Sequence, residues 1–128
     1  MVANLFCQTR LEVSVARIPK RKIRIRRGDT YTHLVTEYDV DGNPESLTGS
    51  SFLVQMRPDP DSSTVTVQFT TQILDSAAGE WQFSLTAAQT NALPAGLYYY
   101  DVQRTYSDST VHTRFQGDVV VENDISHA

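Results

Sequence analysis

The chain lacks the cysteine pairs that cross-link many small proteins and the long apolar segments that anchor others in a membrane. It has 128 residues and a single cysteine, Cys7, so no disulfide can form within the chain. No apolar run approaches the roughly 18 residues that a membrane-spanning helix needs, and Arg10 and Glu12 interrupt any apolar segment of a signal peptide. We therefore expect one domain that is made and used without export through the Sec pathway.

Basic residues are scarce over most of the chain. Residues 28–128 contain three arginines and 14 acidic residues, whereas residues 1–27 contain eight basic residues and one glutamate. The formal charges of these two parts are −11 and +7, a contrast that the total of −4 conceals. A cationic segment joined to an anionic body is suited to electrostatic attachment.

Apolar and polar residues alternate along most of the sequence with a period of two, which is typical of half-buried strands. Residues 30–38 are rich in β-branched and aromatic types, but their pattern does not indicate which face is buried. The alternating apolar positions elsewhere are Leu11, Val13 and Val15; Ile23 and Ile25; Phe52, Val54 and Met56; Val65, Val67 and Phe69; Trp81, Phe83 and Leu85; Tyr98, Tyr100 and Val102; and Val111, Thr113 and Phe115, with Val119 and Val121 following a predicted bulge at Gly117.

Turn-forming sequences separate these runs. The segments 41–44 (DGNP) and 58–61 (PDPD) are strong turn signals, and residues 107–109 (SDS) predict a hairpin between the last two long strands. The segment 86–89 (TAAQ) fits a capping box and predicts a short helix over about residues 86–92, which Pro94 and Gly96 end. The sequence therefore predicts an all-β fold, an antiparallel sandwich or barrel, with one short helix.

A set of turn and strand-end motifs follows in a distinctive order. It comprises RGDT at 27–30, DGNP at 41–44, LTG at 47–49, MR at 56–57, GEWQF at 79–83, LTAAQT at 85–90 and LPAGLYYYD at 93–101. In this order the motifs resemble small virion proteins of tailed bacteriophages that are related to the N-terminal domain of baseplate upper proteins. The resemblance implies an immunoglobulin-like β-sandwich and an adaptor role, joining fibres or other modules to the particle. It implies no catalytic residues.

The resemblance covers roughly residues 27–123, which is also where the charge changes sign. We therefore expect a basic N-terminal arm over residues 1–26, a sandwich domain over residues 27–123 and a C-terminal tail over residues 124–128. We expect the arm to order only when it is docked.

The basic run has three interpretations. It could neutralise nucleic-acid phosphates, dock onto an acidic protein surface such as another copy's body, or be a solvated charged edge strand. The alternation of Ile23 and Ile25 favours a protein sheet as the target, by strand addition or strand exchange between subunits. The predicted partner-binding residues of the arm are Arg17, Lys20, Arg21, Lys22, Ile23, Arg24, Ile25, Arg26 and Arg27.

We expect no catalytic, cofactor-binding or metal-binding residues. The sequence has no nucleophile elbow, phosphate loop or dinucleotide fingerprint. The segment 39–43 looks like the start of a calcium loop, but Pro44 and Ser50 stand where that loop needs glycine and glutamate. No histidine has a spacing typical of metal ligands, and we expect His33 and His112 to be partly buried strand residues.

One residue of the body is a further candidate for partner binding. Tyr98 and Tyr100 should face the core, so Tyr99 should point outward beside Asp101, where it could contact another subunit. Together these features predict a non-enzymatic phage virion structural protein that binds copies of itself and other virion proteins, with a tail or baseplate adaptor as first choice. Capsid decoration (cement) is the alternative, followed by a nucleic-acid-binding protein using the basic arm and, last, a sugar-binding module.

Overall fold

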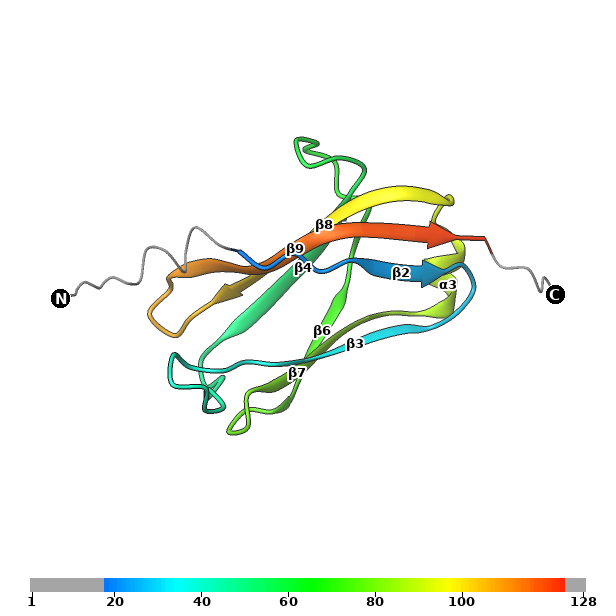
Figure 1. Cartoon of the computed structure of the whole chain (residues 1–128). Coiled ribbons are helices and arrows are strands. Elements are labelled where there is room, and N and C mark those ends of the chain that lie inside the picture. Colours follow the sequence, from blue (N-terminus) through cyan, green and yellow to red (C-terminus); the bar gives the residue numbers. More distant parts are fainter. Residues whose placement is uncertain (1–17, 124–128) are drawn as a thin grey trace.

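The computed structural model describes residues 18–123, which form two packed β-sheets (Figure 1). One sheet has five strands in the order β2-β9-β8-β4-β5, and the other has three in the order β3-β7-β6. The strands are β2 (Ile23–Arg26), β3 (Tyr31–Thr36), β4 (Ser51–Arg57), β5 (Val67–Gln68), β6 (Thr70–Asp75), β7 (Glu80–Leu85), β8 (Gly96–Thr105) and β9 (Val111–Glu122), with one helix, α3 (Ala87–Asn91). The all-β sandwich predicted from the sequence is confirmed.

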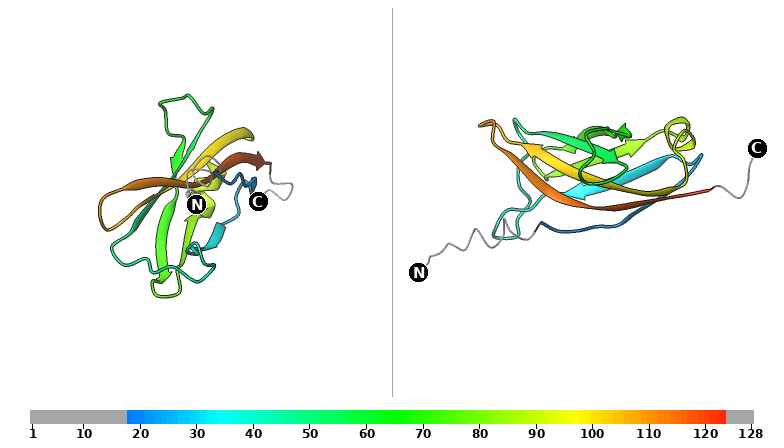
Figure 2. Two further views of the ribbon diagram at one scale, coloured as in Figure 1. Left: turned by 60° about the vertical axis from the view of Figure 1, so that its left-hand side comes forward. Right: turned by 90° about the horizontal axis from the view of Figure 1, so that it is seen from above.

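The core lies between the two sheets, which extend along the length of the molecule (Figure 2). Alternate residues of β7 (Trp81, Phe83 and Leu85) face alternate residues of β4 and β8, as the period-two pattern predicts. Trp81 is fully buried and stacks on Phe52 with 3.8 Å between ring centroids. Tyr98 and Tyr100 also point inward, at 9% and 4% exposure.

Residues 65–69 do not form one strand as predicted. β5 is only two residues long and pairs with β4. Phe69 ends this pairing by donating its backbone N–H to the Val54 carbonyl at 2.9 Å, after which β6 pairs with β7 in the other sheet. The chain therefore changes sheets at Phe69, and β6 is a strand that the sequence pattern did not indicate.

Strand β2 belongs to the sandwich, so the predicted domain boundary at residue 27 is wrong. β2 pairs in parallel with β9, with Ile23 opposite Val119 and Ile25 opposite Val121, and the pairing begins at a bridge between Lys20 and Gln116. Residues 20–26 are therefore part of the five-stranded sheet, and Arg17 and the predicted tail 124–128 lie outside the described residues.

Gly117 is needed for the docking of β2 and is not the predicted bulge. The register between β8 and β9 shifts at Arg114, where Val102 pairs with Phe115 and Gln103 pairs with Thr113. A Cβ at Gly117 would lie 2.2 Å from the backbone oxygen of Arg21, so the two backbones approach too closely for any side chain. The Tyr100 hydroxyl donates to the same Arg21 oxygen at 2.7 Å.

The predicted capping box is confirmed at α3. Thr86 accepts from the backbone N–H of Gln89 at 3.1 Å, and the Gln89 side chain accepts from the backbone N–H of Thr86 at 2.8 Å. After the helix, the Tyr98 hydroxyl donates to the Pro94 carbonyl at 2.7 Å. This contact resembles the tyrosine corner of immunoglobulin-like sandwiches, and together with the strand order it is compatible with that topology.

Candidate docking surfaces

The outer face of the five-stranded sheet carries an ordered row of polar side chains. The pairing of adjacent strands aligns Lys20 with Gln116, Gln116 with Asp101, Asp101 with Gln55 and Gln55 with Gln68. These residues form one line across β9, β8, β4 and β5, with Lys20 contributed by the segment before β2. Directly opposed residues on one face of a sheet are close enough to interact, so the row forms a continuous polar surface.

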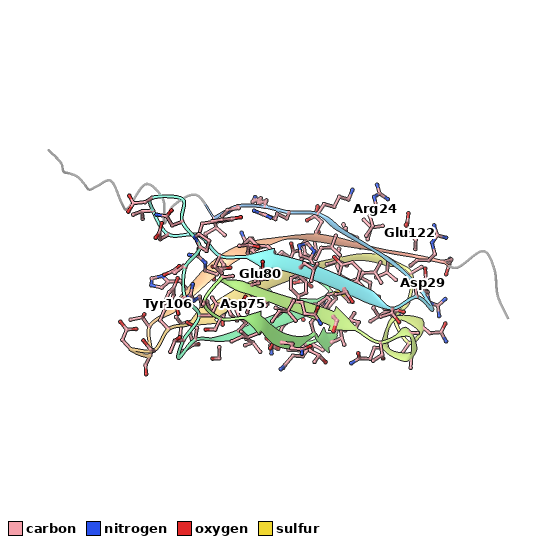
Figure 3. All side chains as sticks on the ribbon, turned by 90° about the horizontal axis from the view of Figure 1, so that it is seen from below. Arg24, Asp29, Asp75, Glu80, Tyr106 and Glu122 are labelled. Carbon is pink, nitrogen blue, oxygen red and sulfur yellow. The ribbon has the colours of Figure 1, made fainter. Side chains whose placement is uncertain are left out.

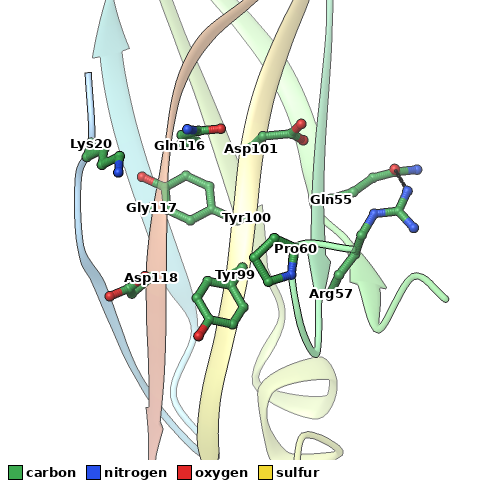
Figure 4. Close-up of a pocket in the computed structure, with 10 residues that line it drawn as sticks. All are labelled: Lys20, Gln55, Arg57, Pro60, Tyr99, Tyr100, Asp101, Gln116, Gly117 and Asp118. Carbon is green, nitrogen blue, oxygen red and sulfur yellow. Dashed lines mark hydrogen bonds between the residues drawn. The ribbon is translucent and has the colours of Figure 1, made fainter. Parts of the chain in front are cut away.

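A second row lies beside the first. It consists of Asp118 on β9, Tyr99 on β8 and Arg57 on β4, aligned by the same strand pairing. Apart from Gln68, the residues of the two rows line a groove of about 290 Å³ that Lys20 bounds on the β2 side and Pro60 on the β4–β5 side (Figure 4). The loop that carries Pro60 projects from the sheet at the top of Figure 1.

The basic group on the β4 side of the groove is already bonded. Arg57 donates from Nη2 to the Gln55 Oε1 at 2.9 Å and from Nη1 to the Ser62 carbonyl at 3.0 Å. Gln55 in turn donates from Nε2 to Gln68 Oε1 at 3.4 Å. These contacts hold the β4 wall of the groove in one arrangement.

Asp101 lines the groove from the first row, between Gln116 and Gln55. Among the described residues, its carboxylate has no hydrogen bond within 3.5 Å and no ion pair within 4.0 Å. Burial raises the pKa of Asp101 above its ordinary value, and the positive charge of Arg57 opposes this effect without cancelling it. The carboxylate is thus partly dehydrated and lacks a direct partner in the described part of the chain.

Tyr99 lies where the sequence placed it, on the outer face of β8 beside Asp101, and it is half-buried in the wall of the groove. Its contact with another subunit remains a prediction. The groove itself was not predicted, because the sequence does not indicate how the loop after β4 folds over the neighbouring strands. The only available signal was the alternation that puts Tyr99 and Asp101 on the same face.

Ile23 and Ile25 are not part of a docking surface. Both are buried, at 2% and 1% exposure, in the core of their own chain. The prediction that they contact a partner is therefore wrong. Their alternation did indicate a strand that joins a sheet, but the sheet is the one formed by β9 and β8 of the same molecule.

The basic side chains of β2 and its flanks have different surroundings. Arg24 pairs with Glu122 at 3.1 Å on the surface, where the two lie side by side in Figure 3. Arg27 donates to Asn123 Oδ1 at 3.1 Å and to the Asn91 carbonyl at 2.9 Å. The Arg21 guanidinium lies 5.2 Å from the centre of the Phe115 ring.

Five basic residues are exposed on this edge of the sheet, and three of them are neither paired with a carboxylate like Arg24 nor packed over a ring like Arg21: Lys20, Lys22 and Arg26. Within residues 18–123, no carboxylate comes within 4.0 Å of their charged groups. Of the predicted arm residues, these three are thus exposed and have no ion pair or aromatic contact within residues 18–123.

A separate polar cluster lies on β3, close to Arg21 of the segment before β2. His33 stacks on Phe83 at 4.7 Å between ring centroids, and its Nδ1 lies 2.9 Å from the Tyr31 hydroxyl. Burial, and secondarily the charge of Arg21, lowers the pKa of His33 below its ordinary value. Burial also raises the pKa of Tyr31 to about 12, so the phenol keeps its proton and can donate it to neutral His33.

His33 is partly buried as predicted, whereas the prediction for His112 is wrong because that side chain is exposed. The segment 39–43 is a hairpin turn in which Asp39 Oδ1 accepts from the backbone N–H groups of Asp41 and Asn43, at 2.9 and 3.0 Å. The described residues contain no group of three or more His, Cys, Asp or Glu side chains placed to hold a metal ion.

The sequence matches no family model, and it has no significant match among curated proteins. Among the helices of residues 18–123, none is long and apolar enough to cross a membrane.

Proposed function

We propose that this protein is a non-enzymatic structural protein of a tailed-phage virion, located in the virion, where it attaches to neighbouring subunits as a tail or baseplate adaptor. The observation that carries the proposal is the basic edge of the sandwich. Lys20, Lys22 and Arg26 continue the charge of the N-terminal segment onto a folded, otherwise acidic domain. A charged surface of this kind favours rapid and specific association with an acidic neighbour.

Two of the motifs that carry the resemblance to phage virion proteins lie together in space. The fully buried Thr90, from the motif 85–90, accepts from the backbone N–H of Gly28 at 3.0 Å and donates to the Asp29 carbonyl at 2.8 Å. Gly28 has a φ of +88°, which favours glycine at this turn. Two of the motifs thus stabilise one corner of the sandwich, which supports reading them as a set.

The burial of Ile23 and Ile25 changes which part of the N-terminal segment is free to reach a neighbour. Residues 20–26 are paired with β9, so an extending arm would consist of the residues before them. That shorter segment still carries Arg10 and Arg17 and the alternating Leu11, Val13 and Val15.

The test is a phage that encodes a variant lacking residues 2–17 and retaining β2. We expect the variant to fold and to be lost from purified particles, as measured by quantitative mass spectrometry. The matched control is Asp41→Asn, a charge change on an exposed turn, which should be incorporated normally. Normal incorporation of the truncated variant would overturn the role of the segment, and absence of the wild-type protein from particles would overturn the virion assignment.

Copy number separates the adaptor from capsid decoration. A tail or baseplate adaptor should be present in a few tens of copies or fewer, whereas a cement protein should be present in hundreds on the shell. Immunogold labelling of intact particles would give the location independently.

Nucleic-acid binding is a second candidate, which the three exposed basic residues favour. If these residues contact phosphates, the triple variant Lys20→Gln, Lys22→Gln, Arg26→Gln should bind DNA more weakly than wild type at low salt. The slope of log K against log salt concentration should fall by about three, one for each lost contact. Equal affinities at every salt concentration would exclude these residues as a DNA-binding surface.

A further inference from the structure

The groove on the outer face of the five-stranded sheet offers mostly hydrogen-bond acceptors. Its floor and β9 side hold the carboxylates of Asp101 and Asp118, the Gln116 amide and the Tyr99 ring. Within residues 18–123, no hydrogen bond within 3.5 Å and no ion pair involves these four side chains. The groove is therefore open to a ligand that brings donors and positive charge.

The basic side chains that line the groove do not supply hydrogen-bond donors to these acceptors. Arg57 directs its donors to Gln55 and Ser62. At Asp101, burial raises the pKa more than the positive charge of Arg57 lowers it. Lys20 is exposed on the opposite side of the groove and forms no ion pair within residues 18–123. A carboxylate with this surrounding gains most from a group that forms charge-assisted hydrogen bonds with it.

The geometry favours a guanidinium over other cations. Tyr99 and Asp101 are alternate residues of β8, so an aromatic ring and a carboxylate lie on the same face two residues apart. A planar guanidinium can donate two hydrogen bonds to a carboxylate while stacking on a neighbouring ring, which an ammonium group cannot do. Tyrosine and arginine are also the side chains that most often anchor protein interfaces.

The chain itself contains a segment of matching charge. Residues 1–17 carry Arg10 and Arg17 with one acidic residue, whereas residues 28–128 have a formal charge of −11. Copies of one protein with this distribution attract each other through the basic segment of one and the acidic body of the next.

We propose that the groove formed by Tyr99, Asp101, Gln116 and Asp118 binds an arginine side chain from the N-terminal segment of a second copy of this chain. Asp101 accepts the guanidinium donors, Tyr99 supplies the stacking surface, and Asp118 adds negative charge at the entrance. The inference deepens the proposed function by naming the contact between subunits, although binding between two copies is testable without particles.

The lone cysteine of the N-terminal segment provides a direct test. An unlabelled copy carrying a nitroxide on Cys7 is mixed with a ¹⁵N-labelled full-length Cys7→Ser copy, and paramagnetic broadening of the labelled amides is measured by NMR. We expect broadening at residues 99–101 and 116–118. In the labelled copy, Asp101→Asn should weaken the association about tenfold or more, because a charge-assisted contact is lost, and Asp41→Asn should leave it unchanged.

The arginines are tested in the spin-labelled copy. Arg10→Gln combined with Arg17→Gln should remove the broadening at the groove. Broadening that persists in this variant or in Asp101→Asn would overturn the proposal. Broadening within a single copy that carries both labels, with none between copies, would place the segment on its own body and would also overturn it. If this assay fails but the protein is incorporated normally into particles, the groove proposal is overturned and the proposed virion function stands. If the assay succeeds but the protein is absent from particles, the virion function is overturned and the groove proposal stands.

Discussion

The Glu37 carboxylate and the Arg104 guanidinium form an ion pair inside the sandwich, with 3.5 Å between Oε1 and Nη1 and side-chain exposures of 4% and 2%. Arg114 donates to the same Glu37 oxygen at 2.9 Å, and Trp81 donates from Nε1 to the other at 3.3 Å. Arg104 also donates to Glu45 at 3.0 Å. Each charge is thus paired and hydrogen-bonded, as a buried ionic network requires.

Breaking this network should destabilise the protein strongly. Arg104→Met removes the central cation, leaves Glu37 and Glu45 undercompensated, and should lower the free energy of unfolding by about 3–5 kcal/mol in urea denaturation. The control is Arg24→Met, which breaks the exposed pair with Glu122 and should cost about 1 kcal/mol or less. Equal losses in the two variants would contradict a structural role for the buried network.

The hydrogen bond from Tyr100 to the Arg21 carbonyl should contribute to the docking of β2. Tyr100→Phe removes only the hydroxyl and should cost about 1 kcal/mol of stability, because the partly buried Arg21 carbonyl loses its donor. Backbone amides of Ile23 and Ile25 should then exchange faster with deuterium. Tyr106→Phe serves as control, since the Tyr106 ring stacks against Arg104 at 4.2 Å and its hydroxyl has no hydrogen bond within the described residues. Slower or unchanged exchange in Tyr100→Phe would argue against the role of this bond.

Stability should depend on pH through His33. The folded protein lowers the pKa of His33, so the unfolded chain binds the proton more readily once the pH falls below the ordinary value of 6.5. The stabilisation is present above that pH and is lost progressively as the pH falls toward the lowered pKa of the folded state. Thermal denaturation between about pH 7.5 and about pH 5.5 should show this loss.

The variant His33→Phe keeps an aromatic ring against Phe83 and should make the melting temperature less dependent on pH over that range. The groups that face His33 are Tyr31, which keeps its proton throughout, and Arg21, whose charge does not change. The same slope in the variant and the wild type would assign the pH dependence to other groups.

Two truncations should separate the arm from the sandwich. A variant lacking residues 2–17 retains β2 and should show a native-like spectrum by near-ultraviolet circular dichroism. A variant lacking residues 2–26 loses the burial of Ile23 and Ile25, worth roughly 3–6 kcal/mol for two such side chains. That loss is comparable to the whole stability of many small domains, so the variant should be largely unfolded. A native-like spectrum for the longer truncation would show that β2 is dispensable.

The period-two pattern predicted most strands, though not β6, because side chains on a strand alternate between core and solvent. The same pattern continues to the buried ion pair, since Arg104 follows the inward-facing series of Tyr98, Tyr100 and Val102, and Glu37 follows that of Tyr31, His33 and Val35. A charged residue at an inward-facing position can be predicted to be buried only when the residue that neutralises it is known. The partner here is 67 residues away in sequence.

The sequence by itself determined the alternating strands, the capped helix at Thr86, the turn at Asp39 and the split of charge near residue 27. All of these depend on neighbours within a few residues. Only the tertiary structure decided that Ile23 and Ile25 face their own core, that Gly117 makes room for Arg21, and that Asp101 lies in a groove beside Tyr99. The physical reason is that strand pairing joins segments nearly a hundred residues apart, and a strand's sequence specifies which side is apolar but not which sheet will cover it.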